Sequence, residues 1–242
     1  MNKYKAIILS LLISFMGASC EDWLYDNVNE DAAHEVLPQQ VLPVVLFYSA
    51  QLQFDHAEYG AYLTQTLTTG GRNQTSSFAY KSGWGDFLTM NRHPQWRRHF
   101  YDIGVNAKEI IDEAHEAQAW NLELIGRTLR LMSTQMTTDL FGDMPRSEAY
   151  ESNSPHYDTQ ESIYEWMNQE IEELIGMYED PTYTEAATNI PIDQSIDRVF
   201  AGDLNKWKHY TYALKARLLL RKLPNWENNA ACLLYTSPSP RD

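Results

Sequence analysis

Apolar residues recur at spacings of three and four over most of this 242-residue chain, as they do along the buried face of a helix. Residues 69–87 are different, because four glycines and many small polar residues there indicate a long loop. Two helices are expected to begin at Asp158 and Asp203, whose short carboxylate side chains suit the N-cap position. The apolar pattern predicts three earlier helices, over residues 41–67, 94–118 and 121–140.

The short turn between residues 118 and 121 favours an antiparallel helical hairpin. Hairpins of this size are similar to those of tetratricopeptide proteins, although the strict repeat consensus is absent. We therefore expect a mostly α fold of tetratricopeptide-like helical hairpins with long irregular loops, in which one or two short strands have room to form.

The first twenty residues have the layout of a secretory signal peptide. Basic residues precede an apolar run, residues 6–16, which is too short to span a bilayer, and small residues then lead to Cys20. A cysteine in this place resembles a bacterial lipobox, in which the thiol receives a lipid, whereas the alternative is an ordinary signal with an incidental cysteine. We predict a signal peptide over residues 1–19, lipidation of Cys20 and an acidic tether over residues 20–40.

The end of the chain differs abruptly from what precedes it. Residues 233–242, LLYTSPSPRD, resemble translated sequencing-adapter read-through, and we interpret them as a non-native tail. The alternative is a genuine terminus. The helical domain is accordingly expected over residues 41–232 and to be incomplete at its C-terminal end.

Composition excludes several classes of protein. Asp and Glu outnumber Lys and Arg by 33 to 19, which gives a formal net charge of −14. A chain this acidic is a poor binder of phosphate backbones, so no nucleic-acid partner is expected. The two cysteines, Cys20 and Cys232, are too few for a disulfide scaffold or a cysteine-rich zinc site.

Catalytic motifs are missing from the sequence. None of the seven histidines has the spacing of a metal-binding motif, and no nucleophile elbow, phosphate loop or dinucleotide fingerprint occurs. We therefore expect a protein that is not an enzyme and uses no metal or cofactor. Two acidic clusters are expected on solvated helix faces: Glu109, Asp112 and Glu113, and Glu170, Glu172 and Glu173.

Sugar binding requires less than catalysis, and the loop Gly70–Asn91 carries suitable side chains. A pyranose ring has an apolar face that stacks on Trp or Tyr, and hydroxyl groups that bond to Asn, Arg or Gln. Trp84 lies between two glycines that would let it project, although it would alternatively anchor the loop to the body of the fold. The predicted ligand-binding residues are Arg72, Asn73, Tyr80, Trp84 and Asn91.

Three segments carry a family resemblance. Residues 20–29 place an acidic, Trp-Leu-containing stretch after the cysteine. Residues 137–160 contain an aromatic-Gly-Asp-hydrophobic-Pro turn, then Ser-Glu-Ala, then Tyr-Asp-Thr-Gln at a helix start. Residues 198–225 contain Gly-Asp-x-x-Lys-Trp followed by Leu-Lys-x-Arg-Leu. In this order they resemble the SusD/RagB family of outer-membrane nutrient-binding lipoproteins.

The resemblance implies a SusD-like fold, in which tetratricopeptide-type helices are wrapped by irregular loops. Family members are considerably longer, so the chain would correspond to an amino-terminal part. The motif residues Gly142, Pro145 and Trp207 are expected to build the fold rather than to contact a ligand.

The resemblance also implies a function. Such proteins are lipid-anchored and surface-exposed at the outer membrane, where they cap a SusC-like TonB-dependent transporter. Many bind glycans and some bind peptides. We therefore expect capture of oligosaccharides and their delivery to the transporter. The alternatives are capture of peptides, or a structural helical-repeat protein without a small ligand.

Overall fold

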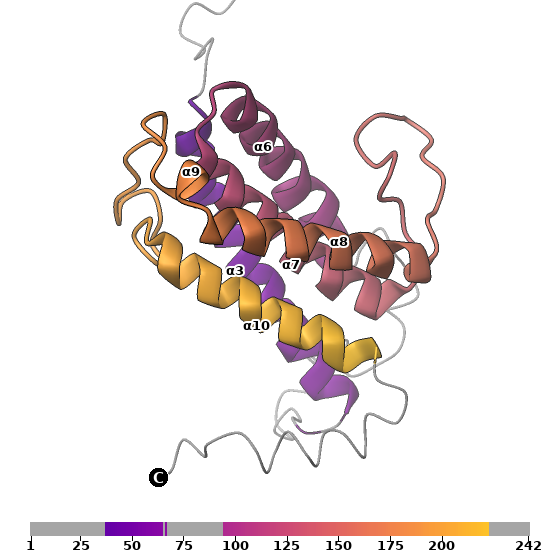
Figure 1. Ribbon diagram of the computed structural model, residues 1–242. Coiled ribbons are helices and arrows are strands. Elements are labelled where there is room, and N and C mark those ends of the chain that lie inside the picture. Colours follow the sequence, from indigo (N-terminus) through magenta and orange to yellow (C-terminus); the bar gives the residue numbers. More distant parts are fainter. Residues whose placement is uncertain (1–36, 65, 67–93, 223–242) are drawn as a thin grey trace, which may run out of the picture. The chain divides into compact units, whose positions relative to one another are not determined.

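The computed structural model describes residues 37–64, 66 and 94–222, and most of these are helical. Within these ranges the β-structure is one isolated bridge, between Met144 and Asp158, so the predicted mostly α fold is confirmed. The helices shown in Figure 1 are α3 (Pro38–Leu63), α5 (Pro94–Arg97), η1 (Arg98–Val105), α6 (Asn106–Glu116), α7 (Trp120–Phe141), α8 (Gln160–Glu179), α9 (Pro181–Thr184) and α10 (Leu204–Lys222).

Helix α7 is the centre of the described fold. It packs against α3, α6, α8 and α10, and α8 and α10 lie side by side (Figure 1). Because neighbours cover it on several sides, α7 is buried around most of its circumference and not along one stripe. Burying one leucine side chain contributes about 1.5–3 kcal/mol to folding. The line predicted to face the core is buried in full: Leu124, Thr128, Leu131 and Gln135.

The predicted helix over residues 94–118 is divided in the structure. A π-helical segment, η1, separates the single turn α5 from α6. The wider turn of a π-helix is rare and often lies at functional sites. The prediction of one continuous α-helix is therefore wrong over residues 98–105, although the prediction of a hairpin between residues 94 and 141 is confirmed.

Two predicted helix signals have different outcomes. Asp203 caps α10 as expected, because its carboxylate accepts a hydrogen bond of 3.0 Å from the backbone N–H of Asn205. Asp158 does not cap α8. The N-cap is Thr159, and the Asp158 carboxylate instead accepts the backbone N–H groups of Arg146 and Ser147 at 2.8 and 2.9 Å. Asp158 therefore fixes the segment that follows α7.

Gly142 ends α7 with a backbone φ of 78°, a left-handed value that favours glycine, as predicted. Trp207 is 2% exposed and belongs to the core, also as predicted. Its indole N–H donates to the buried Asp197 carboxylate at 2.8 Å, and this carboxylate also accepts the backbone N–H groups of Val199, Phe200 and Gly202. A single buried carboxylate thus orders the turn that precedes α10.

Glu170 was expected on a solvated helix face, and that expectation is wrong. The residue is 8% exposed, and its carboxylate accepts two hydrogen bonds from the Arg127 guanidinium, at 2.8 and 3.0 Å. Arg127 also contacts Glu123 and Glu173. Burial alone would lower the pKa of Arg127, but the hydrogen bonds and charges of Glu170 and Glu173 raise it above its usual range. This buried ion-pair network joins α7 to α8.

Candidate binding site

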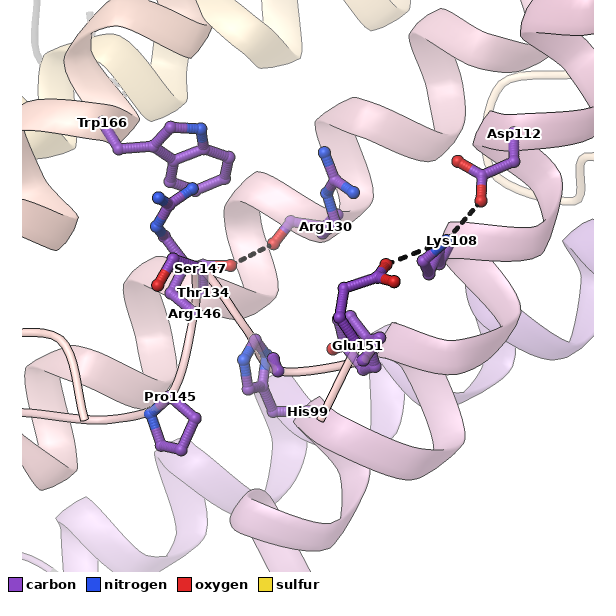
Figure 2. Close-up of a pocket in the computed structure, with 12 residues that line it drawn as sticks. His99, Lys108, Asp112, Arg130, Thr134, Pro145, Arg146, Ser147, Glu151 and Trp166 are labelled. Atoms are coloured by element: carbon purple, nitrogen blue, oxygen red, sulfur yellow. Dashed lines mark hydrogen bonds and ion pairs between the residues drawn. The ribbon is translucent and has the colours of Figure 1, made fainter. Parts of the chain in front are cut away.

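Two adjoining hollows are lined by η1, α6, α7, α8 and the segment that follows α7. The first has a volume of about 300 Å³. Figure 2 shows the residues around it, which come from four helices and from the segment 145–151. Its lining is mainly polar and charged: His99, Lys108, Asp112, Arg130, Thr134, Pro145, Arg146, Ser147, Ala149, Tyr150, Glu151 and Trp166.

Two arginines of the first hollow share an aromatic neighbour. The guanidinium carbon of Arg146 lies 4.7 Å from the centroid of the Trp166 ring, and that of Arg130 lies 6.0 Å from it. Figure 2 shows the Arg146 side chain turned toward the indole. Among the described residues, neither guanidinium has an ion pair or a hydrogen bond to a carboxylate. Burial lowers the pKa of Arg130, which reflects the cost of holding this cation away from water.

The third cation, Lys108, is already neutralised. Its ammonium lies 2.6 Å from a carboxylate oxygen of Asp112 and 3.5 Å from one of Glu151 (Figure 2). With three cations, two carboxylates and a neutral His99, the lining of the first hollow carries one net positive charge. That excess positive charge belongs to the two arginines.

His99 forms the buried wall of the first hollow. Its Nδ1 lies 2.7 Å from the hydroxyl of Ser133. Burial, and secondarily the charge of Arg130, lower the pKa of His99 to about 3, so the ring is neutral at physiological pH. A neutral imidazole offers one donor and one acceptor nitrogen and adds no charge to the hollow.

Tyr150 closes the hollow over the π-helix. A Cβ atom at Gly104 would lie 1.8 Å from the Tyr150 hydroxyl oxygen, so the ring packs against η1 only because residue 104 is glycine. Burial raises the pKa of Tyr150 to about 12, which keeps the hydroxyl protonated. Within the described ranges this hydroxyl makes no hydrogen bond, and its oxygen lies against the backbone of η1 at Gly104.

The second hollow, of about 500 Å³, lies beside the first and shares four of its residues. Val105, Ser152 and Asn153 complete its lining. The shared residues form the boundary between the hollows: Lys108, Ala149, Tyr150 and Glu151.

No group of three or more His, Cys, Asp or Glu side chains in the described residues is arranged to hold a metal ion. Within the same residues, no helix has the length and hydropathy of a membrane span. The first hollow, with its polar and charged lining, can bind a polar or anionic molecule, because pockets of about 300–1,000 Å³ typically hold small ligands.

Sequence comparison assigns the family. The model of the SusD-like family, described as "Starch-binding associating with outer membrane", matches residues 48–231. The chain belongs to the SusD-like family. No curated protein sequence matches the chain.

A solved structure has the same fold. The crystal structure of a SusD/RagB family protein from Bacteroides thetaiotaomicron superposes with a TM-score of 0.57 at 22% sequence identity. The alignment covers 77% of this chain and 38% of that protein. The SusD-like chain therefore spans well under half the length of this structural neighbour.

The ligand-binding and lipidation residues predicted from the sequence lie outside the described residues: Cys20, Arg72, Asn73, Tyr80, Trp84 and Asn91. They stay predictions. The structure brings together a different set, Arg130, Arg146, Tyr150 and Trp166. Arg146 and Tyr150 belong to the family motif that was interpreted as structural. Their place in the same motif as Pro145 was the one signal in the sequence that could have indicated this site.

Proposed function

We propose that this SusD-like chain is the glycan-binding part of a surface-exposed outer-membrane lipoprotein that passes oligosaccharides to a SusC-like TonB-dependent transporter. The observation that carries the proposal is the family match over residues 48–231, because that family is described as starch-binding and associated with the outer membrane. The signal layout ending at Cys20 supplies an anchor, since acylation holds a protein at a bilayer.

The chemistry of the two hollows supports sugar binding. Sugars are held by aromatic faces and by donors that bond to hydroxyl groups. The half-buried Trp166 ring provides an aromatic side chain, and Arg130 and Arg146 provide donors.

Binding without catalysis is the proposed activity. The carboxylates near the hollow, Asp112 and Glu151, are both paired with Lys108, which leaves neither poised as a general acid opposite a second carboxylate. Anchored beside a transporter, such a protein raises the local concentration of ligand and partner without any new contact.

The test is a binding screen of the full-length mature protein against glycans and peptides. We expect saturable binding to at least one class of oligosaccharide, and co-purification of a TonB-dependent transporter from detergent-solubilised outer membranes. Binding to peptides alone would assign the alternative ligand class. Recovery of the lipoprotein without any transporter, together with no effect of its deletion on nutrient uptake, would contradict the proposal.

A further inference from the structure

Resting on the proposed glycan binding, we propose that the first hollow selects acidic glycans, with the carboxylate of a uronic acid residue bound by Arg130 and Arg146 beside Trp166. The family description names starch, which is a neutral polymer of glucose. The proposal therefore concerns the ligand class of this chain in particular.

The first hollow differs in charge from the chain as a whole. The chain carries a net charge of −14, yet the lining of this hollow is net positive. Charges in solution are screened over about 8 Å at physiological ionic strength, so the nearby arginines and not the distant acidic surface decide what the hollow attracts. Within the described residues, Arg130 and Arg146 have no carboxylate partner, so this hollow of an acidic protein has a local preference for anions.

Arg130 is held partly away from water, which costs free energy. A cation withdrawn from water without a partner is unfavourable, and proteins normally pair such groups, as Arg127 is paired with Glu170 on the same two helices. Arg130 lies one turn further along α7 and is half-buried. Among the described residues its guanidinium has no ion pair; it lies near the Trp166 ring, and the charges that act on it include those of Glu170, Arg127 and Asp112. A ligand carboxylate would supply the missing charge.

The guanidinium group also matches a carboxylate in shape. A guanidinium presents its donors in a planar fork that matches a carboxylate, whereas a neutral hydroxyl satisfies one donor and no charge. The Trp166 ring lies against the guanidinium group of Arg146. A pyranose that carries its carboxylate on C5 could place that group at the arginines while its ring contacts the aromatic side chains. Sulfate esters share the anionic chemistry and are the other anion that the arginines could bind.

The experiment measures binding of the full-length mature protein to oligosaccharides of galacturonate, glucuronate and mannuronate, each paired with its neutral methyl ester. Binding of a sulfated galactan oligosaccharide is measured as well, because its sulfate ester is the other anion that the arginines could bind. We expect one uronate to bind at least about tenfold more tightly than its methyl ester. We also expect this preference to weaken as salt is raised, while the affinity for the ester stays unchanged.

Variants assign the preference to the hollow. Arg146→Gln keeps the backbone N–H that donates to the Asp158 carboxylate, so it should not lower the melting temperature much. The variant should bind the uronate about tenfold more weakly, which removes its preference over the methyl ester. Arg130→Gln should act in the same direction. The matched control is Arg198→Gln, which makes the same charge change at an exposed position outside both hollows and should change nothing.

The outcomes are distinguishable. Equal affinity for uronates and their esters, or an Arg146→Gln variant that keeps the preference, would overturn the acidic-glycan proposal and leave the proposed function standing if neutral glycans bind. Tighter binding of the sulfated oligosaccharide than of every uronate would overturn the assignment to a carboxylate. Failure to bind any glycan would overturn both proposals.

Discussion

The guanidinium carbon of Arg146 lies 4.7 Å from the centre of the Trp166 ring, so the segment after α7 is held against α8 by a cation over an aromatic face. Such a contact is worth about 0.5–1 kcal/mol at an exposed site. It positions the cation but does not neutralise it, which an ion pair would do. The contact therefore explains how the fold can hold the Arg146 cation in place without an ion pair.

Gly104 should be intolerant of substitution. In Gly104→Ala, the new methyl group would meet the Tyr150 hydroxyl and also the backbone carbonyl of His99, 2.6 Å away. Because backbone cannot move aside cheaply, we expect a loss of about 1–3 kcal/mol or more, measured by chemical unfolding. The control is Gly176→Ala in α8, where nothing lies within 4 Å and a gain of about 0.5–1 kcal/mol is expected. Equal effects of the two changes would contradict the packing described here.

Arg127 should be a strong stability determinant. Arg127→Met would leave the buried Glu170 carboxylate without its main partner, at an expected cost of about 3–5 kcal/mol in the free energy of unfolding. Lys215→Met breaks the more exposed ion pair with Glu172, and it should cost no more than about 1 kcal/mol. Converting both Arg127 and Glu170 to Met should recover part of the loss, and failure to recover any would argue against direct coupling of the two residues.

His99 should make stability sensitive to mild acid. The pKa of His99 in the folded protein is about 3, below its ordinary value of 6.5, so between these values the unfolded chain binds a proton that the folded chain does not. Stability from this residue is therefore complete above pH 6.5 and is lost progressively as the pH falls toward 3. The melting temperature of the native protein should fall between pH 6.5 and about 5 more steeply than that of His99→Gln. Parallel curves would show that His99 is not the responsible group.

Cys20 should determine membrane attachment. If the small residues before it form a lipoprotein signal, Cys20→Ala removes the acyl chains that anchor the mature protein. The variant should then leave the outer-membrane fraction or stay unprocessed, and the mass of the native N-terminal peptide should include lipid. A native peptide without lipid, together with unchanged fractionation of the variant, would contradict the prediction.

Local patterns predicted most of the helical fold. Helix α7 begins and ends, and helices α8 and α10 begin, within a few residues of the expected positions, because apolar spacing, capping residues and the terminal Gly142 are signals carried by neighbouring residues. The shift of the cap from Asp158 to Thr159 shows the limit. Both residues have capping side chains, and the choice depends on the demand for hydrogen bonds from Arg146 and Ser147, twelve and eleven residues away.

Tertiary arrangement determined what the sequence did not reveal. Glu170 and Glu172 look alike in a helical pattern, but only Glu170 meets Arg127 in the interior. The π-helix over residues 98–105 packs Gly104 against Tyr150, more than forty residues away in the sequence, and no local spacing encodes that contact. The candidate hollow is assembled in the same way from five separate segments, so its arginines resemble ordinary surface cations until the fold places them together.

The most direct test is a crystal structure of the full-length mature protein with the oligosaccharide that binds best in the screen. We expect a sugar residue in the first hollow, against Trp166 and Tyr150, with a carboxylate oxygen about 2.7–2.9 Å from a guanidinium nitrogen of Arg146. A bound oligosaccharide that lies elsewhere on the protein, with no contact to Arg130 or Arg146, would contradict it.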